Sequence, residues 1–192
     1  MLGLAIFWKG HQMKLTLIEE TLIKKAKMHD EVSFAELMQY HGKSLYKIAK
    51  AILKNDDDVA DAMQDTALTC WNKIKTLEKE EYFKTWLIRI LINHCRQIYR
   101  KRRQWLPMEH IENMQTQKDD YSNVEWQELL NTLSIKYREV ISLYYAEGFK
   151  VNEIAQILDT SESTVKRRMA KAREKLKKIY EAQDNLTRGY VK

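Results

Sequence analysis

The chain has 192 residues, 44% of them apolar, and carries a formal net charge of +6 with a pI near 9.1. This composition excludes a wholly disordered chain, and the excess of basic residues favours an anionic partner. One proline and five glycines indicate a mostly helical protein, while Cys70 and Cys95 lack the spacing of a zinc site or a disulfide framework and favour a reducing cytosol.

The N-terminal stretch MLGLAIFW is apolar but short. It lacks the basic region and cleavage site of a signal peptide, and it is far shorter than the roughly 20 residues that span a bilayer. No later window approaches that length, so we expect a soluble, cytoplasmic protein. Residues 1–30 are predicted to form a partly disordered N-terminal extension, in which Met13 is an alternative start to Met1.

Residues 31–103 contain segments of helical periodicity that predict a bundle of three or four helices. The first segment is FAELMQYHGKSLYKIAKAIL. The second begins at Asn55, a good N-cap, and three aspartates that suit a helix N-terminus follow it. Its expected apolar stripe is Val59, Met63, Ala67, Cys70 and Ile74. The third segment is YFKTWLIRILINHCRQIYRKRR, and its expected core positions are Trp86, Leu87, Ile90, Leu91, His94 and Ile98.

The second helix leaves one face free opposite its apolar stripe. This face carries Asp61, Gln64, Asp65 and Leu68. A solvated acidic face is the simplest interpretation of the pattern taken alone. A metal site is a weaker alternative, because the three consecutive aspartates cannot converge on one ion and the glycine and distal glutamate of a calcium loop are missing. We therefore expect no metal.

The third helix carries a polar stripe at steps of four, three and four residues. Its members are Arg89, Asn93, Arg96 and Arg100. Basic residues at a helix end can simply complement the helix dipole. Here the stripe runs on into RKRR, and this many charges in line with an asparagine favour phosphate binding. The aromatic residues Phe83 and Trp86, just upstream, are assigned to the core.

An acidic segment divides the chain. Residues 104–128 have a net charge of −5, between blocks of +6 and +5, and they contain the only proline, Pro107. The segment has no sustained helical period, so residues 104–123 are predicted to be a flexible linker. The fold expected is all-α, with two small helical domains at 31–103 and 124–182 and a tail at 183–192. Such a linker would let the domains occupy separate sites on one extended ligand.

Residues 151–178 have the pattern of a helix-turn-helix. Ala155 supplies the small residue and Val165 the apolar residue that the crossing of two helices requires. Asp159 occupies the turn, where positive φ is needed, and Thr160 or Ser161 can cap the second helix. The second helix is expected to bury Val165, Met169, Ala172 and Leu176. Its other side is basic, which suits docking in the major groove, although a solvated basic helix is an alternative.

Taken together, these segments resemble the extracytoplasmic-function sigma factors, promoter-recognition subunits of bacterial RNA polymerase. DVADAMQDTALTCW and FKTWLIRILINHCRQIYRKRR are similar to region 2 of that family. LLNTLSIKYREVISLYYAEGFKVNEIAQILDTSESTVKRRMAKAREKLKK is similar to region 4. The chain departs from the family pattern at Ser134, where Leu-Pro is usual, at Asp159 instead of the turn glycine, at Ala67 instead of Phe, and at 95–97, which lack an acidic residue.

The resemblance implies roles for the free surfaces. The face with Asp61, Gln64, Asp65 and Leu68 would bind core polymerase. The stripe of Arg89, Asn93, Arg96 and Arg100, with the loop at 73–82, would bind the −10 element and hold an unstacked base. The set of Ser163, Thr164, Lys166, Arg167, Ala170 and Lys171 would bind the −35 element. The acidic linker would thread through the polymerase.

The resemblance also implies the partners: the clamp helices of the largest polymerase subunit and the flap, promoter DNA, and a membrane-anchored anti-sigma factor in a stress- or signal-responsive system. No cofactor, no small-molecule substrate and no catalysis are expected, because neither a nucleophile–base pair nor a metal cluster is present in the pattern. A stand-alone helix-turn-helix regulator is the alternative. In that case the face around Asp61 would have no function.

Overall fold

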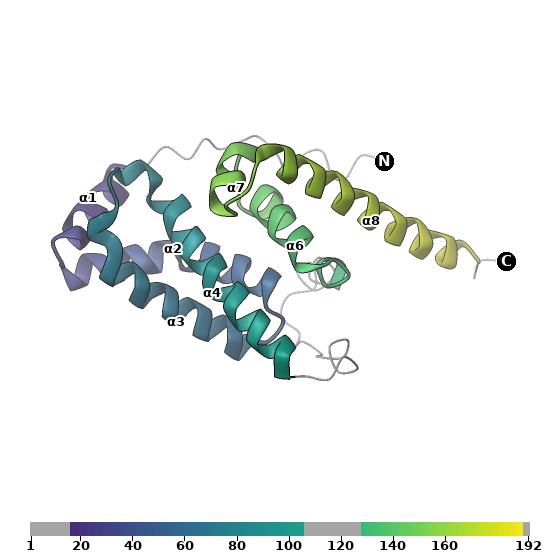
Figure 1. Cartoon of the computed structure of the whole chain (residues 1–192), viewed down its shortest axis with the longest axis horizontal. Coiled ribbons are helices and arrows are strands. Elements are labelled where there is room, and N and C mark those ends of the chain that lie inside the picture. Colours follow the sequence, from purple (N-terminus) through teal and green to yellow (C-terminus); the bar gives the residue numbers. More distant parts are fainter. Residues whose placement is uncertain (1–15, 106–127, 190–192) are drawn as a thin grey trace.

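The computed structural model describes residues 16–105 and 128–189, and every regular element in these two ranges is helical (Figure 1). The helices of residues 16–105 form an N-terminal bundle, and those of residues 128–189 form a C-terminal group that lies beside α2 and α4. The elements are α1 (Leu17–Lys27), α2 (Glu31–Ile52), α3 (Asp56–Lys73), η1 (Ile74–Thr76), η2 (Glu80–Tyr82), α4 (Phe83–Trp105), α6 (Ile135–Ile141), η4 (Ser142–Ala146), α7 (Val151–Ile157) and α8 (Glu162–Gly189). The expected all-α fold is confirmed.

Side-chain caps fix where the helices of the N-terminal bundle begin. Asn55 accepts hydrogen bonds from the backbone N–H groups of Asp57 and Asp58, as the sequence predicts for the start of α3. Asp30 caps α2 in the same way, and its hydrogen bonds with Ser33 lower the pKa of its carboxyl. Thr16 caps α1. Each cap satisfies backbone donors that would otherwise have no partner in the helix.

Helix α1 lies within the segment that the sequence analysis assigned to a partly disordered extension. Residues 17–27 of this segment are helical, because Ile23 and Ala26 are fully buried against α2. Glu19 is also buried, and its Oε1 lies 3.1 Å from Nε2 of His41 on α2. The structured part of the N-terminal bundle therefore begins before residue 31. Residues 1–15, with the alternative start at Met13, lie outside the described residues.

The C-terminal group contains the expected helix-turn-helix. Asp159 adopts a φ of +52°, the left-handed conformation expected at the turn. Ser161 then caps α8, since its Oγ accepts a hydrogen bond from the N–H of Thr164. Val165, Met169 and Ala172 are buried where α8 crosses the group, whereas Leu176 is only half-buried. Helix α8 continues to Gly189, beyond the domain end expected at 182.

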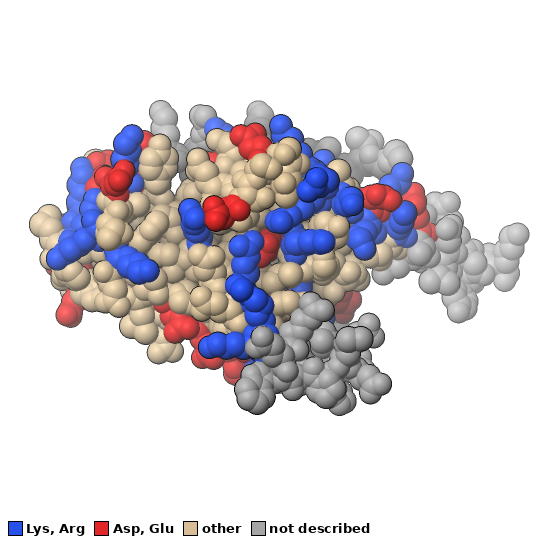
Figure 2. All heavy atoms as spheres, in the orientation of Figure 1, with Lys and Arg blue, Asp and Glu red and all other residues tan. Residues whose placement is uncertain are grey.

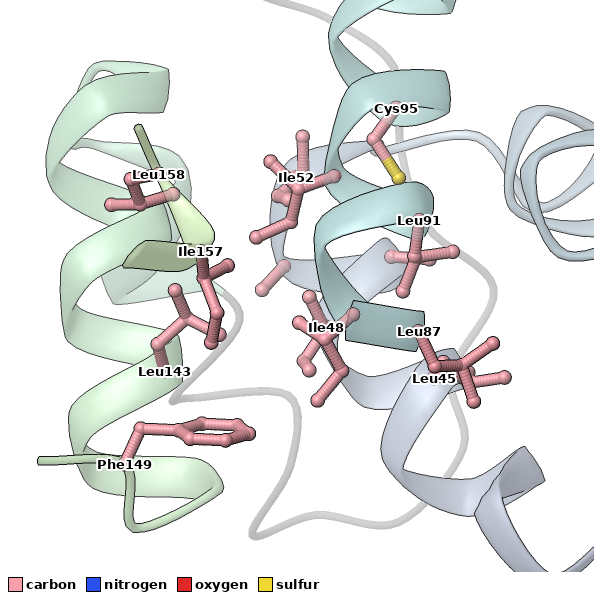
Figure 3. Close-up of a cluster of buried hydrophobic side chains, with 14 of the residues drawn as sticks. Leu45, Ile48, Ile52, Leu87, Leu91, Cys95, Leu143, Phe149, Ile157 and Leu158 are labelled. Atoms are coloured by element: carbon pink, nitrogen blue, oxygen red, sulfur yellow. The ribbon is translucent and has the colours of Figure 1, made fainter. Parts of the chain in front are cut away.

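The C-terminal group packs directly on the N-terminal bundle. Figure 3 shows the apolar contact between them, with α2 and α4 on one side and η4, the following turn and α7 on the other. Its labelled members are Leu45, Ile48, Ile52, Leu87, Leu91, Cys95, Leu143, Phe149, Ile157 and Leu158. On α6, Arg138 is 3% exposed and Nη1 donates to the carbonyl oxygen of Ala51 at 3.4 Å. Burial lowers the pKa of Arg138.

The two predicted helical domains therefore meet directly in this structure. The physical reason is the apolar surface that each domain has left over, which is removed from water when the two domains meet. Most of the linker that was expected at 104–123 lies outside the described residues. No helix within the described ranges is long and apolar enough to cross a membrane.

Candidate nucleic-acid interface

The face predicted on α3 is exposed as one surface. Asp61, Gln64 and Asp65 are exposed, and Leu68 keeps 56% of its surface accessible, which is high for a leucine. Asp65 Oδ2 lies 3.9 Å from Nδ1 of His94 on α4, and this weak contact is the only one of its kind on the face within the described residues. On the opposite side of α3, Val59 and Cys70 are buried as the sequence predicts, whereas Met63 and Ala67 are half-buried and Ala62 and Thr66 are fully buried instead. The sequence therefore predicted the buried side of this helix only in part.

The polar stripe on α4 is only partly free. Asn93 and Arg100 are exposed, and Arg100 Nε donates to the carbonyl oxygen of Arg96 at 3.2 Å. Arg89 is half-exposed, and its Nη2 lies 3.6 Å from Oδ1 of Asp159 in the helix-turn-helix. The C-terminal group thus already contacts the first turn of the stripe. An exposed pair of this length contributes little to stability.

Arg96 is engaged more strongly. Its Nε and Nη2 donate to the two carboxylate oxygens of Glu139 on α6 at 2.6 and 2.9 Å, a bidentate pair. Glu139 is 3% exposed, and its hydrogen bonds raise the pKa of Arg96 above the ordinary value in spite of the burial. The Glu139 carboxylate therefore accepts from the Arg96 guanidinium the same pair of hydrogen bonds that a phosphate could accept.

A second charged contact crosses between the two domains. Nζ of Lys84, the second residue of α4, lies 3.2 Å from Oε2 of Glu147, the residue that follows η4. Glu147 also accepts a hydrogen bond from Ser44 on α2, and the Lys84 ammonium lies 5.1 Å from the ring centroid of Phe149. Lys84, Ile88, Ile92 and Arg96 follow one another at steps of four residues and so lie on one side of α4. Because Lys84 contacts Glu147 and Arg96 contacts Glu139, this side faces the C-terminal group.

The predicted recognition surface of α8 is open to solvent. Ser163, Lys166, Arg167, Ala170 and Lys171 are all exposed. Thr164 is half-buried, and its hydroxyl accepts a hydrogen bond from Ser161 at 3.0 Å. Figure 2 shows Lys and Arg side chains gathered over α8 and, beside them, over the C-terminal half of α4. In this arrangement the two basic surfaces face the same side of the molecule.

The loop between α3 and α4 is fixed from α1. Lys27 Nζ donates to the carbonyl oxygen of Leu77 at 2.8 Å and to Oε1 of Glu80 at 3.0 Å. The sequence analysis did not identify Lys27, Glu139 or Glu147. Their partners lie 43 or more residues away in sequence, so periodicity within one helix gives no indication of them. The described residues contain no cluster of His, Cys, Asp or Glu that could hold a metal ion.

The fold and the two exposed surfaces define a two-domain helical protein with a helix-turn-helix. Comparison with known sequences refines this class. The model of sigma-70 region 2 matches residues 37–105, and the model of sigma-70 region 4 matches residues 123–176. The RNA polymerase sigma factor NccH of Alcaligenes xylosoxydans xylosoxydans is 30% identical over 172 residues, which cover 83% of this chain and 92% of that protein. The RNA polymerase sigma factor SigV of Bacillus subtilis is 30% identical over 135 residues, which cover 69% of this chain and 81% of that protein.

Solved structures agree with these sequence matches. The structure of CnrH in complex with the cytosolic domain of CnrY has a TM-score of 0.67 and 26% identity, and covers 86% of this chain and 98% of that one. The sigma factor RpoE of Bartonella quintana, solved in complex with the anti-sigma factor NepR, has a TM-score of 0.65 and 27% identity. The match covers 77% of this chain and 96% of that one.

The chain belongs to the sigma-70 family, in its extracytoplasmic-function group, and is a sigma subunit of RNA polymerase that acts in transcription initiation. Members of this family are DNA-binding initiation factors rather than enzymes. The stand-alone regulator is not favoured, because the region 2 match covers α3, α4 and most of α2 in the N-terminal bundle. From here on, region 2 means the N-terminal bundle (α1–α4) and region 4 means the C-terminal group (α6–α8).

Proposed function

We propose that the subunit uses three surfaces in sequence. The α3 face, Asp61, Gln64, Asp65 and Leu68, binds the clamp helices of core polymerase. The α4 stripe, Arg89, Asn93, Arg96 and Arg100, then binds the −10 element. The α8 surface, Ser163, Thr164, Lys166, Arg167, Ala170 and Lys171, binds the −35 element. The observation that supports this assignment best is the exposure of the α3 face and the α8 surface on two separate regions of the chain.

The described arrangement is a resting state in this proposal. Glu139 holds the Nε and Nη2 groups of Arg96 and balances its charge, and Asp159 stands beside Arg89, so both arginines are less available to a DNA phosphate. Promoter binding by region 2 therefore requires region 4 to move away. Core polymerase supplies the free energy for this opening if it binds the separated regions more tightly than the packed ones, because a ligand shifts an equilibrium only by its differential affinity.

The subunit is further proposed to be an alternative, stress- or signal-responsive sigma factor of the bacterial cytoplasm that a membrane-anchored anti-sigma factor sequesters. Support comes from relatives: CnrH was solved with the cytosolic domain of CnrY, and RpoE with the anti-sigma factor NepR. A pull-down with the product of a neighbouring gene that encodes a single-span membrane protein tests this part. Absence of a complex with any such product would contradict it.

The α8 surface gives a direct test of the −35 assignment. Replacing Lys166 and Arg167 together with Ala is expected to weaken holoenzyme binding to promoter DNA by about tenfold or more, since one bidentate base contact alone contributes about 1–3 kcal/mol. The dependence of affinity on salt should also decrease by roughly one to two released counterions. The measurement is a salt titration of holoenzyme binding to a promoter fragment mapped by run-off transcription.

A matched control lies on the same helix. Lys177 and Lys178 are exposed and paired with Glu181 and Glu174 one turn away, so they carry the same charge outside the proposed surface. Replacing these two lysines with Ala should leave affinity for the promoter nearly unchanged. Equal losses in the two double variants would show a general electrostatic effect and would contradict a recognition role for the front of α8.

A further inference from the structure

The loop at 73–82 has little regular structure of its own. It consists of the two short 3₁₀ turns, η1 and η2, with Leu77 between them and α4 directly after. Two backbone hydrogen bonds hold it locally, from the N–H of Leu77 to Ile74 and from the N–H of Tyr82 to Lys79. Tyr82 at its end is 51% exposed. A loop of this kind needs contacts from outside to hold one conformation.

Ile74 and Leu77 hold the loop on the hydrophobic core, and Lys27 adds polar contacts at two of its points. Its ammonium donates to the Leu77 carbonyl oxygen between the turns and to the Glu80 carboxylate at the start of η2. The side chains of Lys27 and Glu80 are only 23% and 25% exposed, so the pair is partly shielded from water. The hydrogen bond from Lys27 lowers the pKa of Glu80. One side chain thus joins both turns of the loop to α1.

Helix α1, which carries Lys27, is itself held in place by packing. Ile23 and Ala26, on the turn before Lys27, have no exposed surface, and Glu19 lies against His41 in the interior. The chain then turns at His29, whose φ is +63° and whose ring packs edge-on against Trp71 at the end of α3, 4.7 Å between centroids. The position of the Lys27 ammonium is therefore fixed by packing on both α2 and α3.

We infer that Lys27 is a positioning residue for −10 recognition, which holds the loop at 73–82 in the conformation that accepts an unstacked base. This inference rests on the proposed role of that loop. A loop that is already ordered loses less conformational entropy when DNA binds. The free energy of its contacts with the correct base is then not used to order the loop, and it contributes to the preference for that base over the others. The region 2 model matches residues 37–105, so Lys27 and the rest of helix α1 lie outside that match.

The test compares Lys27→Met with Lys24→Met in holoenzyme. Lys24 lies one turn earlier on α1, is 55% exposed and forms an ion pair with Glu20, so its replacement removes a lysine that has a charge interaction with Glu80 but no hydrogen bond to the loop among the described residues. Open-complex yields are measured on a mapped promoter and on its single-base −10 variants. Lys27→Met is expected to reduce the ratio between the correct base and the wrong bases about tenfold, as small misplacements in a preorganised site do. Lys24→Met should keep the wild-type ratio.

Two further readouts separate positioning from folding. Hydrogen exchange of the backbone amides at 77–82 should become faster in Lys27→Met, while the affinities for core polymerase and for −35 duplex stay at the wild-type level. Lys27→Arg, which keeps a cationic donor, should recover most of the discrimination. Glu80→Gln, which leaves the contact with Leu77 in place, should give an intermediate loss.

The outcomes distinguish this inference from the function on which it rests. Unchanged −10 discrimination in Lys27→Met would overturn the positioning role, even if the loop amides exchange faster. A parallel loss of core affinity would also overturn it, because the residue would then only stabilise region 2. If wild-type holoenzyme itself shows no discrimination at −10, the proposed function of the loop is wrong and Lys27 is not the cause.

Discussion

Glu147→Lys is expected to open the free subunit. The variant places a second cation against Lys84, in a contact where the side chains of Lys84 and Glu147 are 13% and 8% exposed. Breaking a largely buried ion pair costs about 3 kcal/mol or more. Because the pair joins region 2 to region 4, the cost falls on the packed arrangement. The ratio of packed to open molecules should therefore fall roughly a hundredfold, at about 1.4 kcal/mol per factor of ten.

Fluorescence energy transfer between region 2 and region 4 measures this opening. Labels on cysteines introduced at Val32 and Tyr180 suit the experiment, since both positions are strongly exposed. Burial raises the pKa of the Cys70 and Cys95 thiols to about 12, so these two should stay unlabelled. We expect low transfer efficiency in Glu147→Lys. Binding of the free subunit to single-stranded DNA should become stronger as the α4 stripe is released.

Two variants serve as controls for the opening experiment. The exchange Lys84→Glu with Glu147→Lys restores opposite charges and should restore the packed arrangement. Glu174→Lys makes the same change of charge at an exposed site on α8, where Glu174 pairs with Lys178 of the same helix, and should not alter energy transfer. Wild-type transfer efficiency and DNA affinity in Glu147→Lys would contradict the proposal that the contact keeps the subunit closed.

Asp61→Ala combined with Gln64→Ala is expected to reduce affinity for core polymerase roughly a hundredfold, at about 1–2 kcal/mol for each interface side chain. Within the described residues, neither side chain has a hydrogen-bond or ion-pair partner, so their removal should not destabilise region 2. The measurement is a binding titration with purified core polymerase, accompanied by thermal unfolding of the free variant.

Asp56→Ala is the matched control for the α3 face. Asp56 is an exposed aspartate on the same helix, and its carboxylate points to Lys50 on α2 at 2.5 Å instead of along the α3 face. Its removal should leave core affinity within about twofold, the usual range for a residue outside the interface. If the double variant binds core polymerase as tightly as wild type, the α3 face does not have the role proposed for it.

The helices and the helix-turn-helix could be predicted because their causes are local. Asn55 caps α3, Asp159 tolerates the left-handed turn, and Val165 falls on the buried side of α8 through simple periodicity. The same reasoning separated the exposed face around Asp61 from the buried side of α3. Each of these features depends on residues fewer than about a dozen positions apart, where helical spacing determines which residues share a face.

The packing of region 4 on region 2 could not be predicted in that way. Ile88, Ile92 and Cys95 are fully buried, although the expected core of α4 ran along Leu87 and Leu91. A helix that is apolar on more than one side needs a second partner, and periodicity does not say which part of the chain supplies it. Arg96 was predicted to bind DNA, but in this structure it is paired with Glu139. That partner lies 43 residues away, beyond the linker, so helical periodicity gives no sign of it.

Run-off transcription with purified core polymerase tests the central claim most directly. We expect the wild-type subunit to direct transcripts of defined length from a subset of genomic fragments. The Asp61→Ala, Gln64→Ala variant should give far fewer of them because it binds core polymerase more weakly, and the Lys166→Ala, Arg167→Ala variant because its holoenzyme binds the promoter more weakly. No promoter-dependent transcript on any genomic template, together with a DNA footprint in the absence of polymerase, would contradict the account.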